Sequence, residues 1–182
     1  MSLREFGAQP NSPDAMTYMG WRTFYARRYD DAIGWMRKAL ELEPKSGNAR
    51  VWLAASYAFK GQHPQALAEC AILEKDPEQW DEAFASTIGS VYAVCGQRDK
   101  ALQMLDRIRE RETHGYVDPC DYAYVHAGLG DNEQAFAYLK RAVEVHSVNL
   151  LQMNLEPVFD ALRSDPRFAE LLRITGPPGA KP

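Results

Sequence analysis

Four short segments decide the fold: DDAIGWM at 30–36, PQALAEC at 64–70, DKALQML at 99–105 and EQAFAYL at 133–139. The third residue of each segment is an alanine, and these alanines are spaced by 34, 35 and 34 residues: Ala32, Ala66, Ala101 and Ala135. Four positions after each alanine stands a space-filling residue: Met36, Cys70, Leu105 and Leu139. A period of this length is typical of helical repeat proteins, so it organises everything else in the chain.

The residues upstream of each alanine repeat in the same register. Five positions before it stands a turn residue, which is arginine in the first copy and glycine in the others: Arg27, Gly61, Gly96 and Gly130. Glycine tolerates the left-handed conformation that ends many helices. Twelve positions before each alanine stands another small residue: Gly20, Ala54, Gly89 and Ala123. We expect the two small residues of a copy to face each other, so that each copy forms a close-packed helical hairpin.

Helix starts support this interpretation. An acid or hydroxyl precedes a proline, as a capping residue precedes the first helical position, at Ser12-Pro13, Asp76-Pro77, Asp118-Pro119 and Asp165-Pro166. His63-Pro64 opens a further helix, and Asp131 with Gln134 resembles a capping box. The predicted helices are 14–26, 30–43, 47–60, 64–75, 80–95, 98–111, 119–129 and 132–146, with a short one at 156–162 and a last one at 166–174. No run of alternating apolar and polar residues is long enough to predict a strand.

A single hairpin cannot bury its own apolar face, so the copies are expected to stack. The predicted fold is all-α, with four stacked helical hairpins and a C-terminal capping helix; the family resemblance described below implies that the stack is a right-handed α-α superhelix. The expected parts are repeats at 14–46, 47–79, 80–115 and 116–146, a cap at 147–175, a flexible leader at 1–13 and a flexible tail at 176–182.

The bulk composition limits the classes of function. The 182 residues, 46% hydrophobic and 25% charged, suit one domain, and the net charge of −4 disfavours nucleic acid as a partner. Three cysteines stand far apart without a CxxC pair, which argues against a disulfide framework and a zinc site. The first residues lack an apolar signal core, and no apolar stretch reaches the roughly 20 residues of a membrane span. These features favour a cytoplasmic protein with reduced thiols.

The repeat pattern resembles that of the tetratricopeptide repeat family. The matching residues are Gly20, Tyr29, Ala32, Ala39 and Pro44 in the first copy, Leu53, Tyr57, Gly61 and Ala66 in the second, Gly89, Tyr92, Gly96 and Ala101 in the third, and Ala123, Gly130, Ala135 and Ala142 in the fourth. Thr23 and His126 stand where tyrosine is usual, and Leu73 and Ile108 stand where alanine is usual. These departures predict irregular helix packing in the middle copies.

The last third, 115–176, is similar to the C-terminal repeat segment of many bacterial signalling proteins. In those proteins the repeats follow a winged-helix DNA-binding domain, a cyclase or a protein kinase domain. The phrase LRSDPRFAELL at 162–172 carries this resemblance, and it implies a terminal cap. The chain is therefore expected to be either a free-standing adaptor or the regulatory arm of a longer signalling protein.

Motifs for catalysis and cofactor binding are missing from the sequence. It holds no GxxxxGK[ST], GxGxxG, HExxH, EF-hand loop or GxSxG. The four histidines share no ligand spacing. His126, in place of a tyrosine, is expected to fill a packing position, with a place in the groove as the alternative. We therefore predict a protein that is not an enzyme and that needs no metal or cofactor.

The resemblance implies that the first helix of each repeat lines a concave groove that binds a peptide. The predicted groove residues are Thr17, Trp21, Phe24, Tyr25, Val51, Ala55, Phe59, Ser86, Ser90, Val94, Cys120 and Tyr124. The family's carboxylate-binding mode places Lys and Asn in this groove, whereas Thr17, Trp21, Ser86 and Thr87 stand at those positions here, which predicts that this mode is absent. Trp21 is either a binding anchor or packing between repeats, and for Trp52 packing is favoured.

The expected function is therefore a protein-protein interaction module that binds a peptide or protein as an adaptor or scaffold. The expected partners exclude nucleic acid and membranes. Two alternatives remain, a regulatory arm of a bacterial transcription regulator, cyclase or kinase, and a module for self-association into a homo-oligomer.

Overall fold

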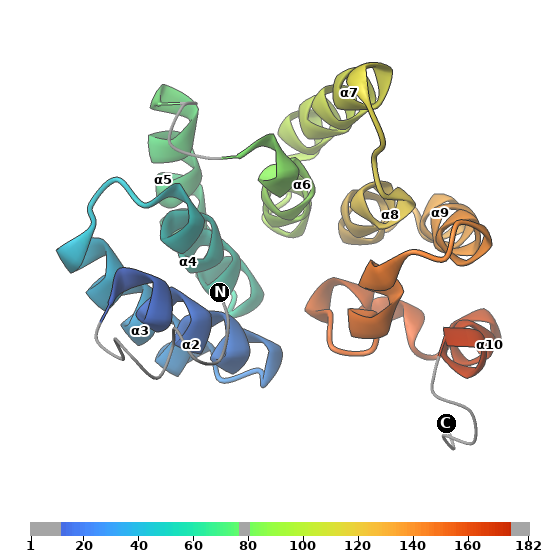
Figure 1. The fold of residues 1–182 in the computed structure, drawn as a ribbon, viewed down its shortest axis with the longest axis horizontal. Coiled ribbons are helices and arrows are strands. Elements are labelled where there is room, and N and C mark those ends of the chain that lie inside the picture. The colour runs from blue at the N-terminus through green and yellow to red at the C-terminus, as the bar shows by residue number, and fades with distance from the viewer. Residues whose placement is uncertain (1–11, 77–80, 176–182) are drawn as a thin grey trace. The chain divides into compact units, whose positions relative to one another are not determined.

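The computed structural model describes residues 12–76 and 81–175, and every regular element within these two ranges is helical (Figure 1). This confirms the predicted all-α class. The chain divides into two compact units, Met1–Phe84 and Ala85–Pro182. Each unit has its own helix packing.

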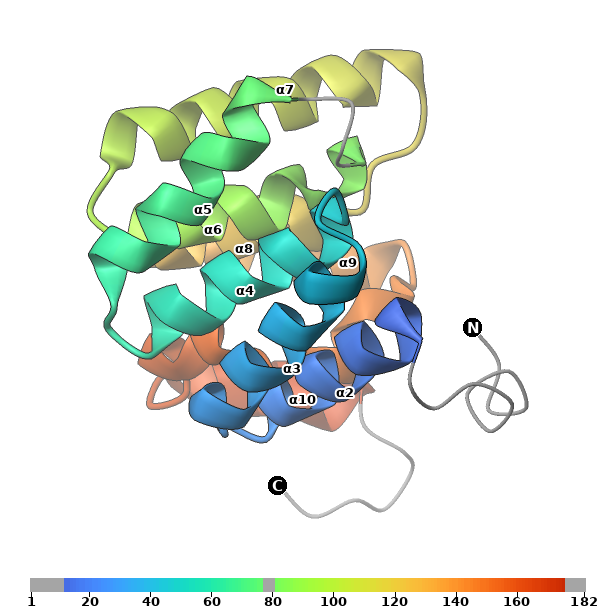
Figure 2. The same ribbon diagram turned by 90° about the vertical axis from the view of Figure 1, so that its left-hand side faces the viewer.

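The first unit contains two helical hairpins. Its elements are α2 (Pro13–Tyr25), α3 (Tyr29–Leu42), α4 (Gly47–Phe59), α5 (His63–Lys75) and the short 3₁₀ helix η2 (Glu82–Phe84). α2 packs against α3, and α4 packs against α5. These pairs lie side by side in Figures 1 and 2. α3 also packs against α4, so the hairpins share one apolar core.

The second unit contains two further hairpins and a cap. Its elements are α6 (Ala85–Val94), α7 (Arg98–His114), α8 (Pro119–Gly128), α9 (Asn132–Glu144), the 3₁₀ helices η3 (Val148–Gln152) and η4 (Pro157–Leu162), and α10 (Pro166–Thr175). α6 packs against α7 and α8 against α9, while α8 also packs directly on α6. η4 covers α8 and α10 covers α9, with Leu162 and Phe168 buried beneath them.

The turns of the four hairpins share one geometry. Gly61, Gly96 and Gly130 have positive φ angles of 84°, 74° and 73°, and Arg27 has 62°. In every turn the next residue donates its N–H to the carbonyl five positions earlier, as from Gln62 to Tyr57 O at 2.8 Å. The predicted turn register is therefore confirmed, and Arg27 occupies a conformation that normally favours glycine.

The contacts of the small helix residues differ from the expectation that Gly20 faces Ala32. A Cβ atom on Gly20 would lie 2.6 Å from Met36 Cε, so Met36 is the nearest neighbour. A Cβ on Gly89 would lie 2.7 Å from Val125 Cγ2 and 3.0 Å from Met104 Cβ. The space over Gly20 is filled by Met36, which stands one turn after Ala32 on α3. The space over Gly89 is filled by Val125 of α8 and by Met104 of α7.

Most predicted helix caps are confirmed. Ser12 accepts from Ala15 N at 3.2 Å, Asp118 from Cys120 N at 2.9 Å and Asp165 from Arg167 N at 2.9 Å. The capping box at Asp131 is wrong, because its side chain makes no cap hydrogen bond. Its Oδ2 instead lies 3.3 Å from Nδ1 of His126. The expected cap at 76–77 reaches outside the described residues.

Helix boundaries differ from the prediction in a few places. The predicted helix at 80–95 is wrong in its first turn, since η2 is a 3₁₀ turn and α6 begins only at Ala85. α7 runs to His114, beyond the expected end at 111. The predicted short helix at 156–162 is a 3₁₀ helix, and η3 was not predicted. The expected flexible tail at 176–182, and the leader up to residue 11, lie outside the described residues.

Candidate functional site

A surface hollow of about 590 Å³ opens in the first unit, over α2 and α4. Its walls carry aromatic side chains, with three small polar or acidic ones: Asp14, Thr17, Tyr18, Trp21, Asn48, Trp52 and Phe84. Asp14, Tyr18 and Trp21 are separated by four and three residues, and so are brought to one face of α2. Asn48 and Trp52 likewise stand one turn apart on α4. Phe84, from η2, completes the wall.

The aromatic rings of this wall belong to a larger cluster. The rings of Trp21 and Trp52 meet edge to face, with centroids 6.5 Å apart and an interplanar angle of 77°. Tyr18 stacks on Trp21 at 5.8 Å. Beneath them Phe24 is 2% exposed and contacts the Trp52 ring at 5.3 Å. Each such pair contributes roughly 0.5–1.5 kcal/mol beyond its buried area, so the wall is held rigidly.

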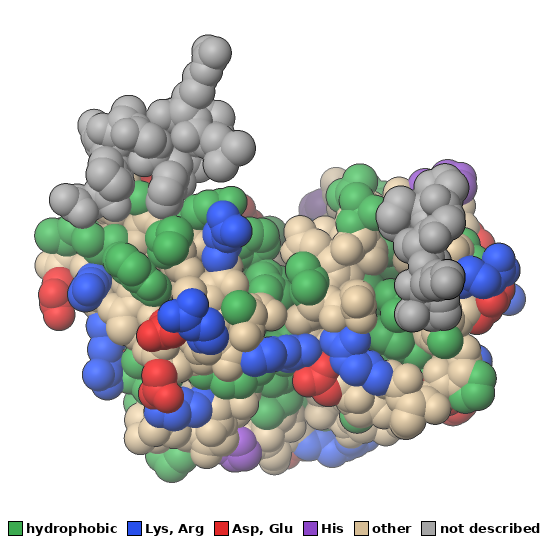
Figure 3. All heavy atoms as spheres, turned by 90° about the horizontal axis from the view of Figure 1, so that it is seen from below, with side chains coloured by type: hydrophobic (Ala, Val, Ile, Leu, Met, Phe, Trp, Pro, Cys, Tyr) green, Lys and Arg blue, Asp and Glu red, His purple; other side chains and the backbone are tan. Residues whose placement is uncertain are grey.

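The wall of the hollow also carries polar groups, from Asp14, Thr17, Tyr18 and Asn48. The hydroxyl of Thr17 donates to the carbonyl of Pro13 at 2.9 Å, so this side chain is engaged within α2. Of the side chains that line the hollow, Asp14 is the charged one, and it is exposed. On the face of the molecule that Figure 3 shows, lysine and arginine side chains lie beside acidic ones. The hollow is therefore lined by aromatic rings and polar groups together, with Asp14 as its charged residue.

The predicted groove residues of the first unit divide into three groups. Thr17 and Trp21 line the hollow. Tyr25 and Phe59 are half-buried members of the aromatic cluster behind it, at 6.0 Å from Trp52 and 5.7 Å from Phe24. Phe24 lies in the core, as do Val51 and Ala55, which are 0% and 1% exposed. The structure thus leaves three of these seven residues partly exposed, Trp21, Tyr25 and Phe59.

The predicted groove residues of the second unit are mostly engaged inside it. Ser86 donates to Asp121 Oδ1 at 3.0 Å, and Ser90 donates to the carbonyl of Thr87 at 2.8 Å. Cys120 Sγ lies 3.7 Å from the hydroxyl of Ser147. Tyr124 stacks on Phe159 of the cap at 5.3 Å, and Val94 is half-buried. The contacts of Ser86, Cys120 and Tyr124 join neighbouring elements of the unit, whereas that of Ser90 lies within α6.

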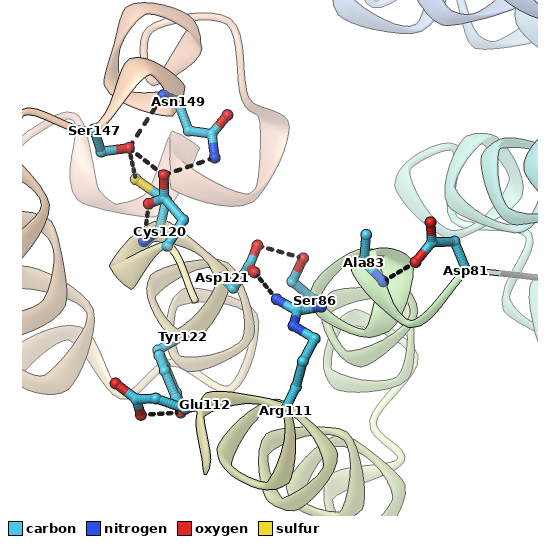
Figure 4. A network of polar contacts seen from close by, with 11 residues as sticks. Asp81, Ala83, Ser86, Arg111, Glu112, Cys120, Asp121, Tyr122, Ser147 and Asn149 are labelled. Carbon is cyan, nitrogen blue, oxygen red and sulfur yellow. Dashed lines mark hydrogen bonds and ion pairs between the residues drawn. The ribbon is translucent and has the colours of Figure 1, made fainter. Parts of the chain in front are cut away.

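A polar network fixes α8 within the second unit (Figure 4). Besides capping α8, the carboxylate of Asp118 accepts hydrogen bonds from Ser147 and from Asn149 Nδ2, the latter at 3.0 Å. Asp121 pairs with Arg111 of α7. Burial raises the pKa of Asp121, while Arg111 and the Ser86 hydrogen bond oppose that rise. The network fixes the position of α8, and the carboxylates of Asp118 and Asp121 are both hydrogen-bonded within it.

The buried thiols of the second unit have unreactive surroundings. Burial raises the pKa of the Cys95 thiol to about 11 and raises that of Cys120 as well. A thiol with a raised pKa holds little of the thiolate that nucleophilic attack requires. Among residues 12–76 and 81–175, no group of three or more His, Cys, Asp or Glu side chains is arranged to hold a metal ion.

A second hollow, of about 640 Å³, lies between α9 and α10. Its floor contains the buried Phe136 and Leu171, and Ile174 at its edge is 49% exposed. The guanidinium of Arg167 lies 4.0 Å from the Phe136 ring centroid and donates to both carboxylate oxygens of Glu133 at 2.9 Å. Sequence reasoning did not single out this surface, although Phe136 and Ile174 stand in the amphipathic pattern of their helices.

Four residues of the first hollow were also missed: Asp14, Tyr18, Asn48 and Phe84. The signal for three of them was present in the helical spacing from Thr17, Trp21 and Trp52. Phe84 gave no such signal, because it lies in a 3₁₀ turn that the repeat pattern does not predict.

Comparison with protein families agrees with this architecture. Residues 24–86 match one tetratricopeptide repeat model, and residues 120–146 match another. Both matches support a tetratricopeptide repeat family. The first match contains α3, α4 and α5, and the second contains α8 and α9. Tetratricopeptide repeats generally mediate interactions between proteins. No curated protein matches the chain.

Within 12–76 and 81–175, no helix combines the length and the apolar character that crossing a bilayer demands.

Proposed function

We propose that this protein is a non-catalytic interaction module that binds a peptide segment of a partner protein in the aromatic hollow of its first unit. The observation that carries the proposal is that hollow itself, whose aromatic walls come from two consecutive hairpins and η2. Exposed tryptophan and tyrosine side chains are the groups that most often dominate binding energies at protein interfaces. The separated, reduced cysteines support a cytoplasmic adaptor or scaffold.

The residues of the hollow suit recognition better than they suit chemistry. Trp21 and Trp52 are half-buried, so each presents part of a ring to solvent while the rest is fixed by neighbouring rings. A rigid aromatic wall loses little conformational entropy when a ligand binds.

The test uses the full chain and a random twelve-residue peptide display library. Peptides selected on the wild type are then measured against Trp21→Ala and Trp52→Ala, with folding checked by circular dichroism. We expect about thirtyfold weaker binding for each variant, the ratio that corresponds to a hot spot of ~2 kcal/mol. Trp35→Ala is the matched control, because Trp35 lies on α3, outside the hollow, with Lys38 4.9 Å from its ring centroid. Selected peptides that bind both hollow variants at wild-type strength would refute the proposal.

Self-association is a second candidate function, favoured by the hollow between α9 and α10. Ile174 is exposed there beside the buried Leu171, as is typical of a helix face that accepts a further helix. Light scattering of the wild type and of Ile174→Glu tests it, and we expect the variant to shift any dimer toward monomer. A wild type that stays monomeric at every concentration excludes this candidate.

A regulatory arm of a bacterial signalling protein is a third candidate, supported by the ending at 162–172. In the structure Leu162, Phe168 and Leu171 of this ending are buried, as a terminal cap requires. Genomic sequence upstream of the codon for Met1 tests it. An in-frame DNA-binding or enzymatic domain there would support it, and a native start codon at Met1 would rule it out.

A further inference from the structure

We infer that the aromatic hollow of the first unit selects a basic side chain, arginine or lysine, of the bound peptide. The cation would lie against the rings of Tyr18, Trp21 and Trp52 and close to the carboxylate of Asp14. This inference rests on the proposed function and adds the chemistry of the ligand to it.

The first argument is the charge of the hollow. No lysine or arginine side chain is among the described residues that line it, and the lining contains the carboxylate of Asp14. Asp14 is exposed, and the ion pairs found in the described ranges do not include it. A cation arriving at the hollow therefore meets one carboxylate in its lining, and the nearby cation of the chain, Arg22, lies over the Tyr18 ring and is not part of the lining.

The second argument is the arrangement of the rings. The Trp21 ring stands at 77° to that of Trp52 and at 29° to that of Tyr18, so the rings that line the hollow do not lie in one plane. Ring faces are electronegative and attract ammonium and guanidinium groups, with the strongest attraction at tryptophan. Walls of this kind are used to recognise organic cations.

The third argument is that this aromatic surface already holds a cation of the chain itself. The guanidinium carbon of Arg22 lies 5.9 Å from the centroid of the Tyr18 ring. Arg22 is exposed and is not among the residues that line the hollow, so it leaves the hollow open. Asn48 adds a neutral amide one turn from Trp52, which suits a hydrogen bond to the backbone of a peptide whose side chain fills the hollow.

The experiment measures how the affinity of the selected peptides depends on their positive charge. Peptides from the display library that lose binding in Trp52→Ala are resynthesised with each arginine replaced by citrulline, or each lysine by norleucine. We expect one such replacement to weaken binding at least about tenfold, as removal of a desolvated cation-π and ionic contact predicts. Asp14→Asn should weaken the unmodified peptide similarly, while Glu41→Gln, an exposed acid on α3, should leave affinity unchanged.

The effects on affinity of the peptide replacement and of Asp14→Asn should also be coupled. Because both remove the same contact, the citrulline or norleucine peptide should bind Asp14→Asn and the wild type equally. Hollow-dependent peptides that lack a basic residue, or that tolerate its replacement, overturn the inference and leave the proposed function standing. Absence of any hollow-dependent peptide overturns both. A dimer that dissociates in Trp52→Ala identifies a second copy as the occupant and also overturns the inference.

Discussion

Gly128 of α8 and Ala93 of α6 meet with no room for a methyl group between them. A Cβ atom on Gly128 would lie 2.9 Å from Ala93 Cβ and 3.4 Å from the carbonyl oxygen of Ser90. Neither neighbour is the free end of a flexible side chain, so Gly128→Ala must push α8 away from α6. We expect the free energy of unfolding, measured by urea titration, to fall by about 1–3 kcal/mol, as overpacking of a core does.

A matched control for this prediction is Gly34→Ala. Gly34 lies inside α3, and a Cβ atom there would have nothing within 4 Å. Alanine is the better helix former by ~1 kcal/mol, so this variant should be stabilised by up to that amount. If Gly128→Ala were as stable as Gly34→Ala, the close approach of α6 and α8 would be disproved.

The left-handed turn at Arg27 predicts a stabilising substitution. A residue with a side chain in this conformation costs ~1–2 kcal/mol, which glycine avoids. Arg27→Gly should therefore raise the free energy of unfolding by about 1 kcal/mol, even though it removes the weak hydrogen bond from Arg27 to the Tyr29 hydroxyl. Gly61→Ala should have the opposite sign, because its φ is 84°. Equal stability of both variants and the wild type would contradict the assigned turn geometry.

Asp118 supports a prediction about the second unit. It caps α8 through Cys120 N at 2.9 Å and also receives hydrogen bonds from Ser147 and Asn149. Asp118→Ala removes the cap and an acceptor for the buried Ser147 hydroxyl, which together should cost about 2–3 kcal/mol of unfolding free energy. Asp106→Ala, in an exposed pair with Arg109, should change stability by less than about 0.5 kcal/mol. If the two variants lost similar amounts of unfolding free energy, the Asp118 hydrogen bonds would stabilise the fold no more than an exposed ion pair does.

His126 predicts how stability depends on pH. It is buried, its ring stacks on Tyr138 at 5.5 Å, and burial lowers its pKa below the usual 6.5, against the raising effect of Asp131. The unfolded chain therefore binds more protons near pH 6.5 than the folded chain does. Stability from this group is present above the unfolded pKa and is lost as pH falls through the folded pKa.

The expected result is a free energy of unfolding that declines when the pH is lowered from about 7.5 to about 5.5. His126→Phe keeps a ring against Tyr138 but cannot titrate, so its decline should be smaller than that of the wild type. His114→Gln, at the exposed end of α7, should keep the wild-type decline. A His126→Phe protein with an unchanged pH profile would assign the decline to other groups.

Much of the fold was predictable because the repeat constrains backbone geometry directly. The register of Gly61, Gly96 and Gly130 identified three turns, and the fourth followed from Arg27 at the equivalent position. Period alone gave no information about η2 and η3, since 3₁₀ segments of three to five residues have no amphipathic pattern to detect.

The candidate site was less predictable than the fold. Transferring one groove register to every repeat assumes that each first helix presents the same face. Of the residues so predicted, Thr17 and Trp21 line the hollow, although Thr17 is only 6% exposed. It did not give an open surface at Val51 and Ala55, because their side chains are buried in the core. Which helix face stays open depends on how large side chains fill the space between hairpins, and a single sequence does not specify that.

The contact between α6 and α8 and the aromatic wall over α2 and α4 also differ in how they can change over evolution. At Gly128 the two helices are so close that almost any side chain would force one of them to move. Substitutions at this position are therefore poorly tolerated. Where rings such as Trp21 and Trp52 form the wall, one ring can be exchanged for another while both helices stay in place. Single substitutions can therefore change the chemistry of the hollow in the first unit while the framework of the second unit is left intact.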